Sequence, residues 1–546
     1  MPYRRSASPF AVTAGAAFVL AVAATIRIIL FADLEPRMDH AFSMQWVQSL
    51  RAAERFGPEA REGSTWLAAL AADDRSWLHA LLRPIHAASL LVLTLGAQTW
   101  FYLGSFPAGA GTSGQVALSI VAHAGATGLL GMIGFSAGGA PLALGAVALA
   151  TISSFLHAFA PLGAHNVALL AMMGTLWAMD RLLRAAAQPE GAYHGMAFTA
   201  FVLQAIALNT YYSVVFLLLA AFILALILSR EIPRRTRVRL VGLHLAATAA
   251  ALLPAAIVAA AELASRAADE KQAFAFYLTW GWDPVYIGAD NTVSWAGAAR
   301  WFEAHAQVFS VPGVALGLAG SIWLAATGRA PLPLAVLLAH FAVWVAMPGF
   351  RQFDRTAVYA VPFLALGIAA TALAAWHARS TMARVAVASA LVWHLAVDSV
   401  RLADLEKYPA WGDYYRRQGE FRAMMRDIAA AVPTDAVLTL WDYDLTHRWR
   451  ALAYGSSGPK IAVPVQILAA RKANSPLPYP PSGIEVSRNF YVLAPEDMAF
   501  DSIRAASIVC GDQPSCPSVR IDKMLTRPHP NDRNRALALY RVDWEP

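Results

Sequence analysis

Long apolar runs recur along most of this sequence and constrain its fold more than any other feature. A transmembrane helix needs about 17–25 predominantly apolar residues. Charged residues make up only 14% of the 546 residues, against 58% hydrophobic ones, whereas a soluble domain has about 25% charged residues. The apolar runs are Phe10–Phe31, Ile85–Leu103, Gln115–Phe135, Ala140–Phe159, Val167–Leu183, Met196–Leu228, Val241–Ala261, Val308–Ala326, Leu332–Met347, Ala357–Trp376 and Val385–Val400. We therefore predict an α-helical polytopic membrane protein with about eleven to thirteen transmembrane helices.

The orientation of these helices follows from the basic residues between them. Ser229–Arg239 holds five arginines in a short segment, which predicts a cytoplasmic loop. Met196–Leu228 is too long for one span and has Asn209-Thr210 at its middle, so we expect two short spans in a tight hairpin. Counting from Arg4 and Arg5 at the N-terminus gives an orientation that differs by one span. Between residues 115 and 160 we therefore expect a re-entrant or interfacial run, or one further span.

The chain is predicted to have two domains. Residues 1–401 form the membrane domain, with external loops at 32–84 and 263–307, and the first run is a retained anchor. Residues 402–546 are more polar and predict a small external, periplasmic α/β domain. Its expected elements are a helix at Asp413–Ala431 and strands at Ala436–Trp441, Ile461–Val465, Phe490–Leu493, Ala506–Val509 and Leu537–Val542. Cys510 and Cys516 lie close together there, as a local disulfide or as two free thiols.

Net charge and known motifs exclude several functions. The net charge of +7 does not indicate a nucleic-acid partner, because the basic residues flank apolar runs instead of clustering in one polar domain. No P-loop or dinucleotide fingerprint is present.

Asp442-Tyr443-Asp444 resembles a metal-binding D-x-D motif, but a chance occurrence of this pattern on the protein surface is the simpler interpretation. Histidines inside predicted spans indicate helix packing or cavity lining, since none are paired at a metal-ligand spacing: His123, His157, His340 and His394.

Ionisable residues gather at the predicted external ends of the spans. Asp39 could remove a proton from an acceptor hydroxyl as a general base. Arginines could stabilise a lipid-linked phosphate as it leaves. Arg27 lies inside the first apolar run, where an arginine either reaches the headgroups or marks a functional site. Alternatively, each of these residues simply flanks a span at the membrane interface. The set consists of Asp39, His40, Arg83, His165, Asn166, Arg351, Asp354, Arg355 and Tyr359.

The segment ATIRIILFADLEPRMDHAFSM at Ala24–Met44 carries a resemblance to a known family. It is similar to the start of polytopic, lipid-dependent glycosyltransferases of the GT-C type, in the bacterial branch of the protein-mannosyltransferase and aminoarabinose-transferase superfamily. Weaker matches follow in the family's order, at Leu82-Arg83-Pro84, Gly163–Arg184, Leu208–Leu228 and Phe350–Leu364. This chain departs from the family pattern at His40, at Asn209-Thr210-Tyr211 and at Thr356.

The resemblance implies an inverting transfer of one sugar from a polyprenyl-phosphate-linked donor at the outer face of a bacterial inner membrane. The acceptor would be a lipid, a glycan or a protein, and a divalent metal is not demanded. Asp39 would be the general base. The residues expected to bind the donor phosphate are Arg27, Arg351, Arg355, Arg83 and His165, and those expected to line the substrate site are His40, Tyr211, Trp280, Trp282 and Tyr359.

Three alternatives stay open at this point. Trp280 and Trp282 belong to an aromatic-rich loop that forms either an interfacial belt or a wall for a sugar or lipid. A lipid or sugar transporter would need polar residues at the bilayer midplane and a repeated half, neither of which is visible. A polysaccharide polymerase or ligase would also work at the outer face with arginines, without a carboxylate in the first loop.

Overall fold

The computed structural model describes most of the chain from residue 104 onward. The described residues are 104–107, 109, 111–153, 164–188, 193–210, 214–265, 295–346, 354–403, 419–434, 436–441, 443–453, 459–462, 489–498, 519–530 and 532–544. The chain divides into two compact units, whose described residues lie within 119–403 for the first and within 104–118 and 419–544 for the second.

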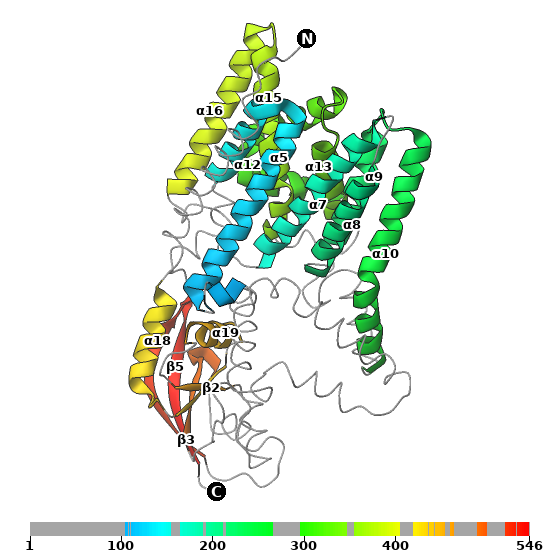
Figure 1. The fold of residues 1–546 in the computed structure, drawn as a ribbon. Coiled ribbons are helices and arrows are strands. Elements are labelled where there is room, and N and C mark those ends of the chain that lie inside the picture. The colour runs from blue at the N-terminus through cyan, green and yellow to red at the C-terminus, as the bar shows by residue number, and fades with distance from the viewer. Residues whose placement is uncertain are drawn as a thin grey trace, which may run out of the picture. The chain divides into compact units, whose positions relative to one another are not determined.

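The first unit is a bundle of helices that follows the predicted apolar runs (Figure 1). Met196–Leu228 divides into two helices on either side of residues 211–213, as predicted. Among the described residues, four helices are long and apolar enough to cross a membrane, and three more are apolar but shorter. The chain is a multi-pass membrane protein. The helices are α5 (Thr112–Ile152), α7 (Ala164–Ala186), α8 (Tyr193–Thr210), α9 (Val214–Leu228), α10 (Arg234–Ser265), α12 (Trp295–Ala326), α13 (Leu332–Ala346), the 3₁₀ helix η3 (Asp354–Tyr359), α15 (Val361–His377) and α16 (Thr381–Ala403).

Helix α5 contains the first apolar run, and the second as far as Ile152, of the segment in which the predicted topology clashed. Gly139 interrupts it with a φ of 75° and a ψ of −164°, a conformation that glycine adopts without steric cost. Gly134 lies against the backbone of Ala143, and Gly131 against the side chain of Val147. The two halves therefore run antiparallel and in close contact. Both pack within the bundle, since Ile133, Leu142, Ala146 and Ala150 are all buried.

Helix α12 is also broken, at Ser310, where φ is 63° and ψ is 159°. The break leaves the last carbonyls of its first half without intrahelical partners. Helix α16 supplies donors for them: His394 Nδ1 bonds to Phe309 O at 2.7 Å, and Arg401 Nη1 bonds to Gln307 O. These side chains also place a polar and a positive group at a helix C-terminus, where the helix dipole favours them.

The His394→Phe variant tests how much this capping contributes. Loss of the Nδ1–H donor leaves the buried Phe309 carbonyl without that bond, which costs about 1–3 kcal/mol. We expect the free energy of unfolding in detergent to fall by that amount. His194→Phe makes the same chemical change at an exposed position on α8 and should alter stability by less than about 0.5 kcal/mol. Equal effects of the two substitutions would contradict the capping role.

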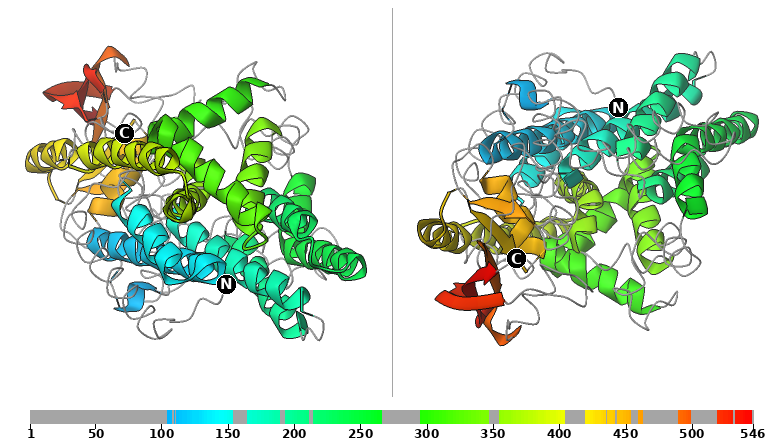
Figure 2. Two further views of the ribbon diagram at one scale, coloured as in Figure 1. Left: turned by 90° about the horizontal axis from the view of Figure 1, so that it is seen from above. Right: turned by 90° about the horizontal axis from the view of Figure 1, so that it is seen from below.

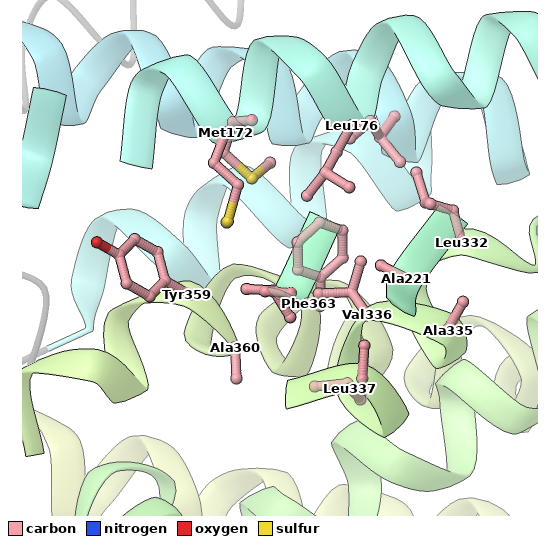
Figure 3. Packing of buried hydrophobic residues seen from close by; sticks show 14 of the residues in the cluster. Met172, Leu176, Ala221, Leu332, Ala335, Val336, Leu337, Tyr359, Ala360 and Phe363 are labelled. Atoms are coloured by element: carbon pink, nitrogen blue, oxygen red, sulfur yellow. The ribbon is translucent and has the colours of Figure 1, made fainter. Parts of the chain in front are cut away.

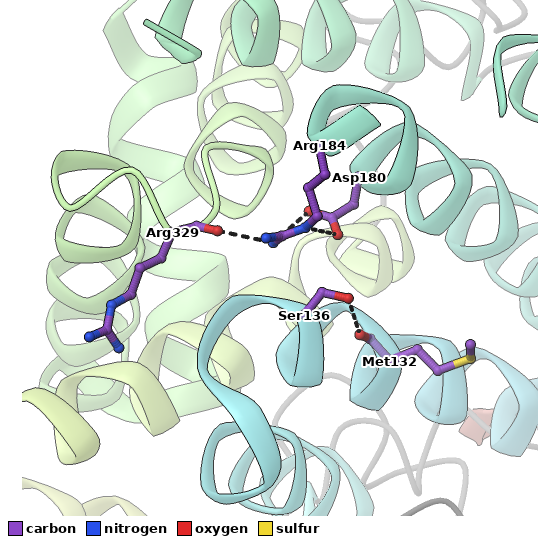
Figure 4. Close-up of polar contacts among 5 residues, drawn as sticks. All are labelled: Met132, Ser136, Asp180, Arg184 and Arg329. Atoms are coloured by element: carbon purple, nitrogen blue, oxygen red, sulfur yellow. Dashed lines mark hydrogen bonds and ion pairs between the residues drawn. The ribbon is translucent and has the colours of Figure 1, made fainter. Parts of the chain in front are cut away.

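An ion pair within α7 orients an arginine that donates a hydrogen bond to the connection between α12 and α13 (Figure 4). Arg184 Nε lies 2.8 Å from Asp180 Oδ2, and its Nη2 donates to the carbonyl oxygen of Arg329 at 3.0 Å. Asp180 is 1% exposed and the guanidinium is the bonded partner that offsets the cost of burying its charge. These two residues therefore hold the end of α7 to that connection.

Helix α10 lies at the edge of the bundle and is attached mainly to α8 (Figure 2). Its first half is largely exposed, as expected for a surface that faces lipid. Polar bonds hold it in place, because Gln204 Nε2 donates to Thr248 Oγ1 at 2.5 Å and Asn209 Nδ2 to Ala251 O at 3.3 Å. The helix begins at Arg234, so most of the arginine-rich segment predicted as a loop, Ser229–Arg239, is helical.

The core of the first unit lies where α7, α9, α13 and α15 meet (Figure 3). Leu176, Ala221, Val336 and Phe363 are each fully buried. Tyr359 lies at the margin of this cluster, with its hydroxyl directed away from Phe363. The ring of Tyr359, the last residue of η3, therefore packs against the core, and its hydroxyl oxygen points out of the hydrophobic cluster.

The second unit contains a five-stranded sheet, in agreement with the predicted α/β domain. The strand order is β2-β1-β3-β5-β4, in which β1 is parallel to β2 and β3, and β5 is antiparallel to β3 and β4. Strand β4 was not predicted, and the predicted strand at Ala506–Val509 lies outside the described residues. The elements are α18 (Glu420–Ala431), β1 (Val437–Leu440), α19 (Tyr443–Leu452), β2 (Lys460–Ala462), β3 (Asn489–Pro495), η5 (Glu496–Met498), β4 (Val519–His529) and β5 (Asp532–Trp544).

Candidate functional site

The described part of the candidate site lies where α7 begins and η3 ends. Two residues predicted from separate segments meet there: His165 Nδ1 lies 3.4 Å from the hydroxyl oxygen of Tyr359, 194 positions later in the chain. His165 is 8% exposed and Tyr359 is fully buried. The contact brings the start of α7 and the 3₁₀ turn before α15 together.

Neighbouring polar bonds hold the start of α7 in place. Asn166 Nδ2 donates to Ser119 Oγ on α5 at 2.8 Å, and both residues are fully buried. A side-chain bond between two buried helices removes rotational freedom from both, since an unmade bond would leave polar groups desolvated. The start of α7 is therefore bonded to α5 through Asn166, and the side chain of the preceding residue, His165, contacts Tyr359.

The 3₁₀ helix η3 that ends at Tyr359 also carries the backbone of Arg355, four residues earlier. Thr356, the following residue, is bonded through its carbonyl oxygen to His340 Nε2 on α13 at 3.0 Å. His340 Nδ1 in turn accepts a hydrogen bond from Trp301 Nε1 on α12 at 2.8 Å. Thus η3 is attached to the bundle at two points, by Thr356 near its start and by Tyr359 at its end.

Trp301 has a different role from the one expected for its segment. The predicted external loop 263–307 is helical from Trp295 onward. Trp301 is 1% exposed and stacks on His305 with 4.1 Å between ring centroids. It belongs neither to an interfacial belt nor to an open wall, because its ring is enclosed by other helices. Sequence patterning missed this because an apolar aromatic residue fits a belt and a core equally well.

The helix-packing interpretation of the buried histidines is confirmed for His340 and His394, which both bond to residues on other elements. Within the described residues, no group of three or more His, Cys, Asp or Glu side chains could hold a metal ion. Of the D-x-D motif, Tyr443 and Asp444 open α19 directly after β1, and Asp442 lies outside the described residues.

Most of the predicted site residues lie outside the residues that the structure describes, so their assignments stay predictions. Arg355 is placed only through its backbone in η3. The remaining predictions outside the described residues are Arg27, Asp39, His40, Arg83, Tyr211, Trp280, Trp282, Arg351, Cys510 and Cys516.

Comparison with known proteins identifies the fold. No protein-family model matches the sequence, and a comparison with curated proteins finds no significant match. Among solved structures, ArnT from Cupriavidus metallidurans bound to undecaprenyl phosphate is similar, with a TM-score of 0.53 and 11% identity over 96% of this chain and 98% of ArnT. Its apo structure gives a TM-score of 0.52 and 12% identity over 97% and 98%. This chain has a GT-C fold.

The archaeal oligosaccharyltransferase AglB from Archaeoglobus fulgidus is a further structural neighbour. Its TM-score is 0.49 at 12% identity, over 91% of this chain and 71% of AglB. Each ArnT structure matches this chain over nearly the whole length of both proteins. The structural similarity therefore includes both the helical bundle and the C-terminal α/β part.

Proposed function

We propose that this chain is a membrane glycosyltransferase that uses a polyprenyl-phosphate-linked sugar as its donor. The contact of His165 with Tyr359, on the 3₁₀ helix that also carries Arg355, is the observation that supports the proposal most. It joins two segments that the sequence assigned to one polar site. One of the structures with the same fold contains undecaprenyl phosphate, and the similarity extends over nearly the whole of both chains. We therefore propose that this protein also binds a polyprenyl phosphate.

In the proposed reaction one sugar moves in a single displacement. Asp39 takes the proton of an acceptor hydroxyl, whose oxygen attacks the anomeric carbon of the donor. The bond between that carbon and the phosphate oxygen breaks on the opposite face, so the configuration inverts. Polyprenyl phosphate leaves as an anion, and the arginines stabilise the charge that develops on it. The proposed arginines are Arg27, Arg351 and Arg355, with Arg83 and His165 as further phosphate contacts.

The remaining roles are proposed on the same basis. His40, Tyr211, Trp280, Trp282 and Tyr359 would line the substrate site, where aromatic faces suit a sugar ring or a prenyl chain. The reaction would take place at the periplasmic face of the inner membrane, on the side that carries the C-terminal domain. The acceptor would be a lipid, a glycan or a protein.

Binding of undecaprenyl phosphate to the purified full chain in detergent tests the donor class. We expect Arg355→Ala to weaken binding about 10- to 100-fold, because a hydrogen bond to a charged group contributes about 1.5–3 kcal/mol. Arg379→Ala is the matched control, since Arg379 is an exposed arginine in the connection between α15 and α16. It should leave the dissociation constant unchanged.

Two results would contradict the proposal. Equal affinities in the two arginine variants would remove Arg355 from the phosphate site. Movement of labelled undecaprenyl-phosphate sugar across vesicles by the wild-type protein, with no sugar released to any acceptor, would indicate a lipid transporter instead.

A further inference from the structure

A chain of three hydrogen-bonded groups connects α12 to the backbone beside Arg355. Trp301 Nε1–H can only donate, so His340 Nδ1 accepts at 2.8 Å. The carbonyl of Thr356 can only accept, so His340 Nε2 donates at 3.0 Å. The two partners together require a neutral imidazole with its proton on Nε2. A doubly protonated ring would lose the bond from Trp301.

The imidazole is held in this orientation from all sides. His340 is fully buried. Its ring centroid lies 5.7 Å from that of Trp344 and 5.3 Å from that of His305. His305 Nδ1 donates to the carbonyl oxygen of Trp301 at 2.7 Å, within the same helix. A ring packed this closely cannot rotate without displacing its neighbours.

The bond from His340 acts on the peptide unit between Thr356 and Ala357, one residue after Arg355. The Thr356 carbonyl is one residue from the Arg355 side chain, and the far end of η3 is fixed by Tyr359 against His165. With both ends in contact with the bundle, the backbone of η3 that carries Arg355 is held in one position. A group that binds a transition-state charge must be held within about 0.5 Å of its productive position.

We propose that His340 is a positioning residue for Arg355, acting through the Thr356 carbonyl and depending on Trp301 for its tautomer. The inference rests on the proposed function, in which Arg355 binds the lipid-linked phosphate. His340 itself does not contact the donor. Its effect on donor binding is transmitted through the backbone of η3 alone, and this distinguishes it from a residue that only fills space.

The first test is the affinity of purified variants for undecaprenyl phosphate. Replacing His340 by Phe keeps a ring of similar volume and removes both hydrogen bonds, and we expect about tenfold weaker binding, since a displaced binding group loses affinity steeply with distance. His340→Gln can still donate to Thr356 and accept from Trp301, and should restore affinity to within about threefold of wild type. His194→Phe, at an exposed position on α8, should bind like wild type.

A double-mutant cycle with Arg355 separates positioning from packing. If His340 acts through Arg355, His340→Phe causes no further loss of affinity in the Arg355→Ala background. A tenfold loss in that background, or wild-type affinity in folded His340→Phe alone, would overturn the inference. Should His340→Phe fail to fold in detergent, Trp301→Phe serves in its place, with an expected loss of about threefold that likewise disappears in the Arg355→Ala background.

The same measurements distinguish this inference from the proposed function. If Arg355→Ala binds undecaprenyl phosphate as tightly as wild type, the proposed phosphate site is wrong and His340 has nothing to position. If Arg355→Ala binds weakly while folded His340→Phe binds like wild type, the phosphate site stands and the positioning role fails.

Discussion

Replacing Asp39 by Asn is expected to lower the rate of sugar transfer about a thousandfold while the protein still inserts, folds and binds undecaprenyl phosphate. A general base contributes about 10²–10⁴ to a rate, and an amide cannot take the acceptor's proton at neutral pH. The phosphate of the donor is an anion, so removing a carboxylate should leave its binding unchanged or slightly tighter. The effect should therefore fall on kcat and not on donor affinity.

Asp33→Asn is the matched control for this prediction. Asp33 lies six positions before Asp39 in the same acidic segment and carries no proposed role. Transfer of radiolabelled sugar from an undecaprenyl-phosphate donor should proceed at the wild-type rate in Asp33→Asn. Wild-type transfer by Asp39→Asn would exclude Asp39 as the base. Weak donor binding in Asp39→Asn with an unchanged kcat would indicate that Asp39 orders the donor site instead.

The helices of the bundle could be predicted because hydrocarbon imposes a single requirement on them. A span must satisfy its backbone hydrogen bonds internally, so a long apolar run is almost always a helix. The predicted run Leu332–Met347 and the observed helix Leu332–Ala346 differ by one residue. The division of Met196–Leu228 into two helices followed from the same length argument.

The break in α12 was not predicted, because its causes are scattered over the chain. Pro312 signals a kink, but the freed carbonyls beside Ser310 are bonded by His394 and Arg401 of α16, far along the chain. No pattern within Val308–Ala326 reveals those partners. The bond from His340 to Thr356 was hidden for the same reason, since a backbone acceptor leaves no mark in the sequence.

Strand β4 was missed because it lies at the edge of its sheet. Val519–His529 carries several charged residues and Pro528, which argue against a strand in the middle of a sheet. At an edge the same residues are favourable, because charge and proline discourage pairing with another chain. In the candidate site, His165 and Tyr359 lie in contact, and that their segments form one functional site stays a prediction. That prediction came from their positions at span ends.

Adding one methyl group at Gly367 is expected to destabilise the helical bundle strongly. Helices α12 and α15 cross in contact at Gly317, Gly320 and Gly367. A Cβ atom at Gly367 would lie 1.9 Å from the carbonyl oxygen of Gly317, and one at Gly320 would lie 1.9 Å from that of Gly367. Both obstacles are backbone atoms, so no side-chain rotation can relieve the clash. In membranes such small residues allow the helix backbones to approach closely.

We expect Gly367→Ala to lower the free energy of unfolding in detergent by about 3 kcal/mol, as overpacking in a rigid core does. Gly242→Ala adds the same methyl group to exposed α10, where nothing lies within 4 Å. There the change should stabilise by about 0.5–1 kcal/mol, because alanine is the better helix former. Opposite signs in the two variants would establish the crossing as a fixed contact, whereas equal small effects would show that α12 and α15 can separate freely. Because η3 leads into α15, Gly367→Ala should also weaken undecaprenyl phosphate binding, and Gly242→Ala should not.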